Sequence, residues 1–159
     1  MQLRLAPWAL LAVAAMWGIS FVWMKDILDQ QDVYSFLTSR FFFAALAMII
    51  IKPKVLKLFT KELVSKGFII GLALGSGYIF QTLGLDRTTP AITGFITGLY
   101  VVITPLIAAL LLKERVTLTM WGFILLAVVG LAVLSVEGWS VGIGEFLVFI
   151  SALLFAVHI

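Results

Sequence analysis

Five long apolar runs divide this chain and restrict what it can fold into. A hydrocarbon core of about 30 Å is crossed by about 20 helical residues. Lipid offers no hydrogen-bond partner to a free backbone group, so runs of this kind cross as α-helices. The sequence therefore predicts an all-α integral membrane protein. The five predicted spans are residues 7–24, 33–51, 67–84, 91–112 and 118–136.

The charged residues are few and cluster between the apolar runs. They make up 12% of the chain, against about 25% in typical soluble domains. The mean hydropathy is +1.18, so the partner of this surface is a lipid bilayer. The formal net charge is +3, but most lysines lie in one short loop beside two spans, which indicates a topology signal and not a nucleic-acid-binding surface. Cysteine is absent, which excludes disulfides and thiolate metal sites.

Lysine and arginine are distributed unequally between the two sides of the predicted membrane. Cytoplasmic loops carry the excess of these residues. One side has Lys25 and Arg87; the other has Arg4, the five lysines of residues 52–66, Lys113 and Arg115. The sequence therefore predicts a multi-pass protein of the plasma or inner cell membrane with a cytoplasmic N-terminus.

A sixth apolar run begins at Glu145 and reaches Ile159, which makes it shorter than a full span. Within it, residues 151–157 resemble residues 13–19. Five spans is an odd number, so a second copy of the unit would enter the membrane from the opposite side. That is an inverted-topology repeat, as in many secondary transporters. We expect a first five-helix repeat over residues 1–138, then a linker and the truncated start of a second repeat over residues 139–159.

Several motifs occur in the order and spacing of a known family. They are Trp17-Gly18, Arg40-Phe41, Gly84 to Ala91, Leu99 to Pro105 and Leu110 to Thr117. Together they resemble the EamA-like branch of the drug/metabolite transporter superfamily. The resemblance implies ten helices in two inverted halves that move small-molecule metabolites across a membrane. It also implies that this chain is the N-terminal half, whose partner is the missing second half. For Glu114 it implies a structural role at the fourth-to-fifth turn, while a solvated loop residue is the alternative.

Two proline residues mark the fourth span. Pro90 suits the first position of a helix, with Thr89 placed to cap it. Pro105 lies inside the span, where it removes a backbone donor and is expected to bend the helix.

Polar side chains gather on one face of the third span and one face of the fourth. A polar group facing lipid loses its hydrogen bonds, so these faces should meet protein or a water-filled cavity. We therefore leave two interpretations open, a translocation path and helix packing through hydrogen bonds. The residues are Tyr78, Gln81 and Thr82 in the third span, and Thr93, Thr97, Tyr100 and Thr104 in the fourth.

Arg40 is the charged residue that lies well inside a span. A charge at mid-membrane costs about 2.5–3.5 kcal/mol on insertion scales, so it usually has a partner. Contact with an anionic substrate or gating is one interpretation; snorkelling or pairing with Asp32 or Asp29 is the other. In the first span, Trp17 and Ser20 are candidates to line the path. Residues 67, 71 and 75 are glycines at the spacing of a helix-packing ridge.

The chemistry available to the chain favours transport over catalysis. The sequence contains no metal-ligand cluster, no nucleophile with a base and no phosphate-binding glycine loop, so we predict no enzyme activity and no cofactor. The leading hypothesis is a metabolite or drug exporter or permease, here as an incomplete chain. One alternative is a small multidrug-resistance-type dimeric exporter, although its first-span glutamate is absent from residues 7–24. The other is a non-transporting membrane subunit or scaffold.

Overall fold

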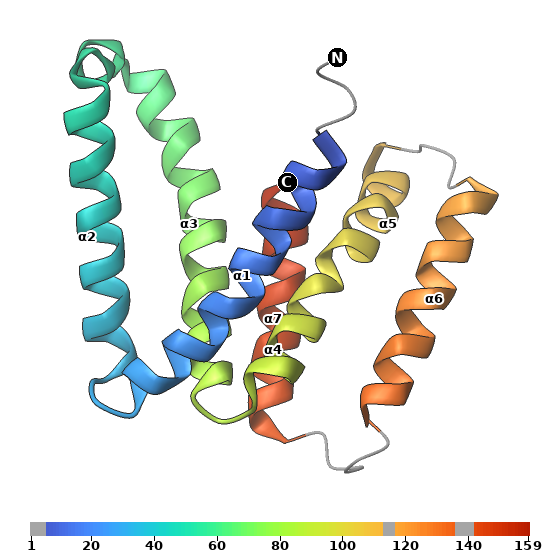
Figure 1. The fold of residues 1–159 in the computed structure, drawn as a ribbon. Coiled ribbons are helices and arrows are strands. Elements are labelled where there is room, and N and C mark those ends of the chain that lie inside the picture. The colour runs from blue at the N-terminus through green and yellow to red at the C-terminus, as the bar shows by residue number, and fades with distance from the viewer. Residues whose placement is uncertain (1–5, 113–116, 136–141) are drawn as a thin grey trace.

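The computed structural model describes residues 6–112, 117–135 and 142–159, and these ranges consist of helices joined by short turns, without a strand (Figure 1). This architecture confirms the predicted all-α fold class. The helices are α1 (Ala6–Leu28), α2 (Val33–Ile51), the 3₁₀ helix η2 (Pro53–Leu58), α3 (Lys61–Leu85), α4 (Pro90–Gly98), α5 (Tyr100–Leu112), α6 (Leu118–Ser135) and α7 (Ile143–His158).

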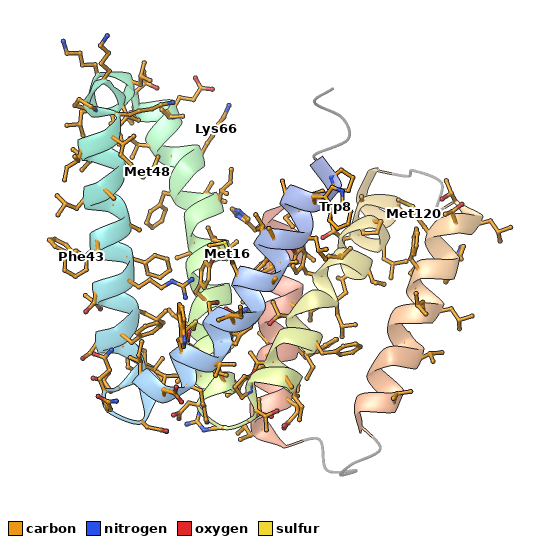
Figure 2. All side chains as sticks on the ribbon, viewed as in Figure 1. Trp8, Met16, Phe43, Met48, Lys66 and Met120 are labelled. Atoms are coloured by element: carbon orange, nitrogen blue, oxygen red, sulfur yellow. The ribbon has the colours of Figure 1, made fainter. Side chains whose placement is uncertain are left out.

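Four helical segments are long and apolar enough to cross a membrane. They are Pro7–Leu28, Val33–Ile51, Lys61–Leu85 and Pro90–Ala109. The Leu118–Gly130 part of α6 and the whole of α7 are apolar but shorter. Large apolar side chains cover the outside of the bundle, and Figure 2 shows Phe43 and Met48 pointing outward from α2. A surface of this kind is suited to lipid.

The helix ends follow the capping chemistry of the sequence. Asp32 caps α2 by accepting hydrogen bonds from the backbone N–H groups of Tyr34 and Ser35 at 3.0 and 3.1 Å. The hydroxyl of Thr89 accepts from the Ile92 N–H at 3.3 Å, and Pro90 occupies the first turn of α4. The predicted start of the fourth span is therefore confirmed.

The fourth span is divided at Leu99, which the sequence did not predict. The Leu99 N–H bonds to the Ile96 carbonyl, three residues back, at 3.1 Å, and the Val102 N–H bonds to the Leu99 carbonyl at 2.9 Å. These i to i−3 bonds tighten the helix locally, while the Ile103 N–H keeps the regular bond to the Leu99 carbonyl at 2.9 Å. The division lies before Pro105, the position at which we expected the helix to bend.

Helix α7 packs along α3 and also contacts α4 and α5 (Figure 1). Small residues allow this approach. A Cβ added to Gly84 would lie 2.4 Å from Val148 Cγ2, and one added to Gly77 would lie 2.6 Å from the Phe155 ring. A Cβ on Gly144 would meet the backbone of Arg87 at 3.0 Å. The two helices run in opposite directions and are closest along the C-terminal half of α3.

The glycine ridge that we expected on α3 makes no such contact. A Cβ added at Gly67, Gly71 or Gly75 would meet no atom within 4 Å in the described part of the chain. The glycines that α7 packs against, Gly77 and Gly84, lie further along α3. Helix α7 reaches the first half of α3 at its last turn, where His158 Nδ1 lies 3.2 Å from the Ile70 carbonyl oxygen, and residues 61–72 are exposed.

The two ends of the bundle differ in how closely the helices approach. The lysine-rich segment of residues 52–66 lies at the open end, where Figure 2 shows Lys66, and the turns at residues 29–32 and 86–89 lie at the other end. There, Lys25 Nζ donates to the carbonyls of Leu85 at 2.9 Å and Asp86 at 2.7 Å. Thr88 Oγ1 donates to the Glu145 carboxylate at the same end. We call this the closed end, because α1, α3 and α7 are connected there.

Candidate functional site

A cavity of about 140 Å³ lies between helices α1, α3, α5 and α7. A single water needs only about 10–15 Å³ by this kind of measure, so the space admits several waters or part of a small molecule. The cavity is lined by Trp17, Leu74, Tyr78, Tyr100, Phe155, His158 and Ile159. Three of the residues predicted from the sequence, Trp17, Tyr78 and Tyr100, therefore meet here.

Four aromatic rings from four helices surround this cavity, and we call Trp17, Tyr78, Tyr100 and Phe155 the aromatic layer. The Tyr100 ring centroid lies 6.2 Å from that of Trp17 and 6.5 Å from that of Phe155. Phe155 lies 5.2 Å from Tyr78 in an edge-to-face arrangement. Such tilted and edge-on pairs are the favourable geometries for aromatic contact. The layer therefore holds α1, α3, α5 and α7 together around an apolar space.

Arg40 lies behind the aromatic layer, against Tyr78. Its guanidinium carbon is 5.0 Å from the Tyr78 ring centroid, within the range of a cation–π contact. Its Nη1 also donates to the Met24 sulfur at 3.4 Å. Neither Asp29 nor Asp32, both in the described part of the chain, forms an ion pair with it. The arginine is thus directed into the bundle and positions a ring of the cavity wall.

Toward the closed end from the aromatic layer lies a set of buried polar residues, which begins one helical turn away and extends to Thr93, two turns from Tyr100. We call Gln81, Thr93, Thr97 and Ser151 the polar layer. All four are at most 2% exposed. Gln81 Nε2 donates to Thr97 Oγ1 at 3.0 Å, which connects α3 to α4. The layer is therefore a closed part of the molecule directly next to the cavity.

Ser151 belongs to the polar layer because of how α7 packs on α3. Val148 contacts Gly84, and Phe155 contacts Gly77. Ser151 lies between these two contacts on α7, at the level of Gln81 on α3. Three side-chain atoms of the layer, Gln81 Oε1, Thr93 Oγ1 and Ser151 Oγ, are buried without a hydrogen-bond partner among the residues that the structure describes. Such atoms are uncommon in native proteins and call for an explanation.

The remaining predicted residues have hydroxyls that bond within their own helices. Ser20 donates to the Trp17 carbonyl at 2.6 Å, Thr82 to that of Tyr78 at 2.8 Å, and Thr104 to that of Tyr100 at 2.7 Å. Of the polar stripe on the fourth span, only Tyr100 lines the cavity, while Thr93 and Thr97 are buried between helices.

The residues with an expected structural role are the two prolines and Glu114. Pro90 begins α4 and Pro105 lies within α5. Glu114 lies outside the described residues.

Sequence reasoning did not identify the residues that α7 contributes. Phe155 and Ser151 lie in a run whose sequence indicates only the start of a second repeat. A signal was present, since aligning residues 151–157 with residues 13–19 pairs Phe155 with Trp17. Within the described ranges no three His, Asp or Glu side chains gather into a metal-binding group. The chemistry of the site is therefore aromatic contact and hydrogen bonding.

Comparison with known proteins places this geometry in a family. The model of the EamA-like transporter family matches residues 4–136. An uncharacterized transporter of Archaeoglobus fulgidus is 39% identical over 155 residues, which covers 97% of this chain and 47% of the relative. The uncharacterized transporter YcxC of Bacillus subtilis is 31% identical over 153 residues, which covers 89% of this chain and 48% of the relative.

The chain thus spans about half the length of these two curated relatives. No solved structure matches it. The family match over most of the chain agrees with the observed helical bundle and its apolar outer faces. The chain belongs to the EamA-like transporter family.

Proposed function

We propose that this chain forms one half of an exporter or permease for small-molecule metabolites or drugs. Residues 1–138 constitute a five-helix repeat, and residues 139–159 begin a second repeat of inverted topology. The excess of lysine and arginine at the open end orients that end, with the N-terminus, toward the cytoplasm. The coverage of about half of each relative supports a carrier of two such halves.

One observation carries this proposal. Trp17 on α1 and Phe155 on α7 are at equivalent positions of the two similar segments, and both rings pack on Tyr100, at 6.2 and 6.5 Å. The two helices run in opposite directions (Figure 1). Equivalent residues on opposite-running helices around one site are the arrangement expected of an inverted repeat, with the binding site at the repeat interface.

The mechanism we propose is alternating access between the open and closed ends. The cavity lies on the open-end side of the polar layer, while Lys25 and the Thr88–Glu145 hydrogen bond connect the helices at the closed end. A substrate enters the aromatic layer from the open end. The closed-end contacts then separate as the two halves move, and the substrate leaves through the polar layer.

The test compares metabolite pools in cells that express the full-length protein or its variants. Untargeted mass spectrometry of cells and medium is expected to show metabolites that redistribute with the wild-type protein. Tyr100→Leu removes the ring shared by Trp17 and Phe155 and should abolish this redistribution. Phe43→Leu is the matched control, because Phe43 is an outward-facing ring on α2 (Figure 2). Identical profiles with wild type, Tyr100→Leu and no protein, at equal membrane levels, would refute transport.

A further inference from the structure

We propose that the polar layer binds a hydrogen-bond-donating head group of the transported molecule, while the aromatic layer holds its apolar or aromatic body. The inference rests on the proposed function and narrows the substrate class. The substrate carries an uncharged N–H or O–H donor next to a ring or another apolar group.

Three polar side-chain atoms of the polar layer are buried without a hydrogen-bond partner among the described residues. Gln81 Oε1, Thr93 Oγ1 and Ser151 Oγ come from three different helices, and their residues are 1%, 0% and 0% exposed. Each such atom loses its hydration on folding and receives no hydrogen bond in return. Gln81 and Ser151 lie at one level of the α3–α7 contact, and Thr93 lies one turn before Thr97, the partner of Gln81. Three such atoms in neighbouring turns are better explained by a guest that binds there than by three separate packing defects.

The second step is the chemistry that the guest must have. An amide oxygen only accepts hydrogen bonds, and the Gln81 amide nitrogen is already used on Thr97. A guest at Gln81 Oε1 must therefore supply an N–H or O–H. The hydroxyls of Thr93 and Ser151 are able to donate or accept. No charged side chain belongs to the layer, so a neutral donor enters with less desolvation cost than an ion.

The third step is the position of the layer relative to the cavity. Gln81 follows Tyr78 by three residues, Thr97 precedes Tyr100 by three, and Ser151 precedes Phe155 by four. These spacings put Gln81, Thr97 and Ser151 about one turn, or about 5.4 Å, from a cavity-lining ring of the same or the adjoining helix. Thr93 precedes Tyr100 by seven residues and so lies about two turns, or about 10.5 Å, from that ring. A molecule with its ring in the aromatic layer therefore has its head group within reach of the polar layer.

The main competitor is an ordered water, because buried waters commonly satisfy groups of this kind. A water and a substrate lead to different expectations for the melting temperature of the unliganded protein when a hydroxyl is removed. A resident water stabilises the fold, so loss of a hydroxyl would lower the melting temperature. A site reserved for substrate leaves these atoms unpaired between transport events, so loss of a hydroxyl should leave the melting temperature unchanged or raise it.

The experiment measures thermal unfolding of the purified full-length protein with increasing benzamide or N,N-dimethylbenzamide. The two probes share the ring and the carbonyl, but only benzamide carries N–H donors. Ligand affinity follows from the dependence of melting temperature on probe concentration. We expect benzamide to bind about tenfold more tightly, the usual value of one hydrogen bond.

Two variants test whether benzamide binds at the polar layer, and a third variant serves as the control. Thr93→Val and Ser151→Ala should each weaken benzamide binding by about threefold to tenfold without lowering the melting temperature of the free protein. Thr82→Val removes an equally buried hydroxyl that is already bonded within α3, so benzamide binding should not change.

Two results would overturn the inference. One is equal affinity of the wild-type protein for both probes. The other is a lower melting temperature in Thr93→Val and Ser151→Ala with unchanged benzamide affinity, which is the result for a structural water. Both leave the transport proposal standing, because the metabolite comparison tests that separately. Conversely, benzamide selectivity without metabolite redistribution would refute transport and retain the site.

Discussion

At the scale of single residues, Arg40 shows how a charge is accommodated within the membrane without an acid. Its guanidinium lies over Tyr78, and its other contact is the Met24 sulfur. We expect Arg40→Leu to lower the free energy of unfolding by about 1 kcal/mol, because a partly buried cation–π contact is lost. Arg40→Lys should lose less, since it keeps the charge but not the planar group. Denaturant unfolding in detergent measures both, and equal losses would show that charge is irrelevant.

A second residue-scale prediction concerns Asp32, the cap of α2. Hydrogen bonds from the Ser35 hydroxyl, and then from the Ser35 and Tyr34 N–H groups, lower the pKa of this carboxyl. A lowered folded pKa means that the carboxylate contributes stability above its unfolded pKa. This contribution is lost as the pH falls through the folded value.

Asp32→Asn keeps a capping side chain but has no charge to titrate. Relative to this variant, the wild-type protein should lose stability as the pH is lowered from about 7 to about 3. Thermal unfolding of both proteins across this range checks the expectation. A pH-independent difference between them would contradict it.

At the scale of helices, the contact of α3 with α7 depends on the absence of side chains at particular glycines. A Cβ on Gly84 would approach Val148 Cγ2 to 2.4 Å and the Gly144 carbonyl oxygen to 2.8 Å. We expect Gly84→Ala to destabilise residues 1–159 by about 1–3 kcal/mol through overpacking. Gly71→Ala is the control, because a Cβ there meets no atom within 4 Å and alanine favours a helix. Equal effects on the unfolding midpoint would mean that α7 packs elsewhere.

The closed end offers another test at this scale. Lys25 donates to the last carbonyls of α3, at the negative end of that helix. We expect Lys25→Met to lower the free energy of unfolding by about 1 kcal/mol, because these carbonyls lose a charged donor. In Lys66→Met the loss should be at most about 0.5 kcal/mol, since the Lys66–Glu62 pair is exposed. A larger loss for Lys66→Met would argue against a connection between α1 and α3 through Lys25.

At the scale of the whole molecule, the inverted repeat predicts that residues 1–159 do not transport by themselves. Two copies inserted in the same orientation are related by an axis along the membrane normal, whereas inverted repeats require an axis in the membrane plane. The lysine and arginine bias opposes insertion of a second copy upside down.

The measurement is metabolite efflux by residues 1–159 compared with the full-length protein, with reporter fusions that locate both termini. Efflux equal to that of the full-length protein, with every N-terminus inside, would contradict the two-half model. Loss of efflux with correct membrane insertion is the expected outcome.

Much of the element list could be predicted from the sequence, because lipid imposes a simple rule on it. Backbone groups without water must bond within a helix, so each long apolar run became a helix, and Val33–Ile51 matched its predicted bounds. Caps such as Asp32 and Thr89 depend on local hydrogen bonds and are equally visible in sequence. Trp17, Tyr78 and Tyr100 were identifiable because rings and hydroxyls stand out among aliphatic neighbours.

The sequence by itself determined that the chain is a set of membrane-crossing helices, and which of its residues are polar inside them. Only the tertiary structure decided that α7 lies against Gly77 and Gly84, that Arg40 faces Tyr78, and that the polar atoms of Gln81, Thr93 and Ser151 are buried. The reason is that the lipid-facing and protein-facing sides of these helices are both apolar. Hydrophobic periodicity identifies the buried side of a helix in water, but in a bilayer the partner helices decide which side is buried.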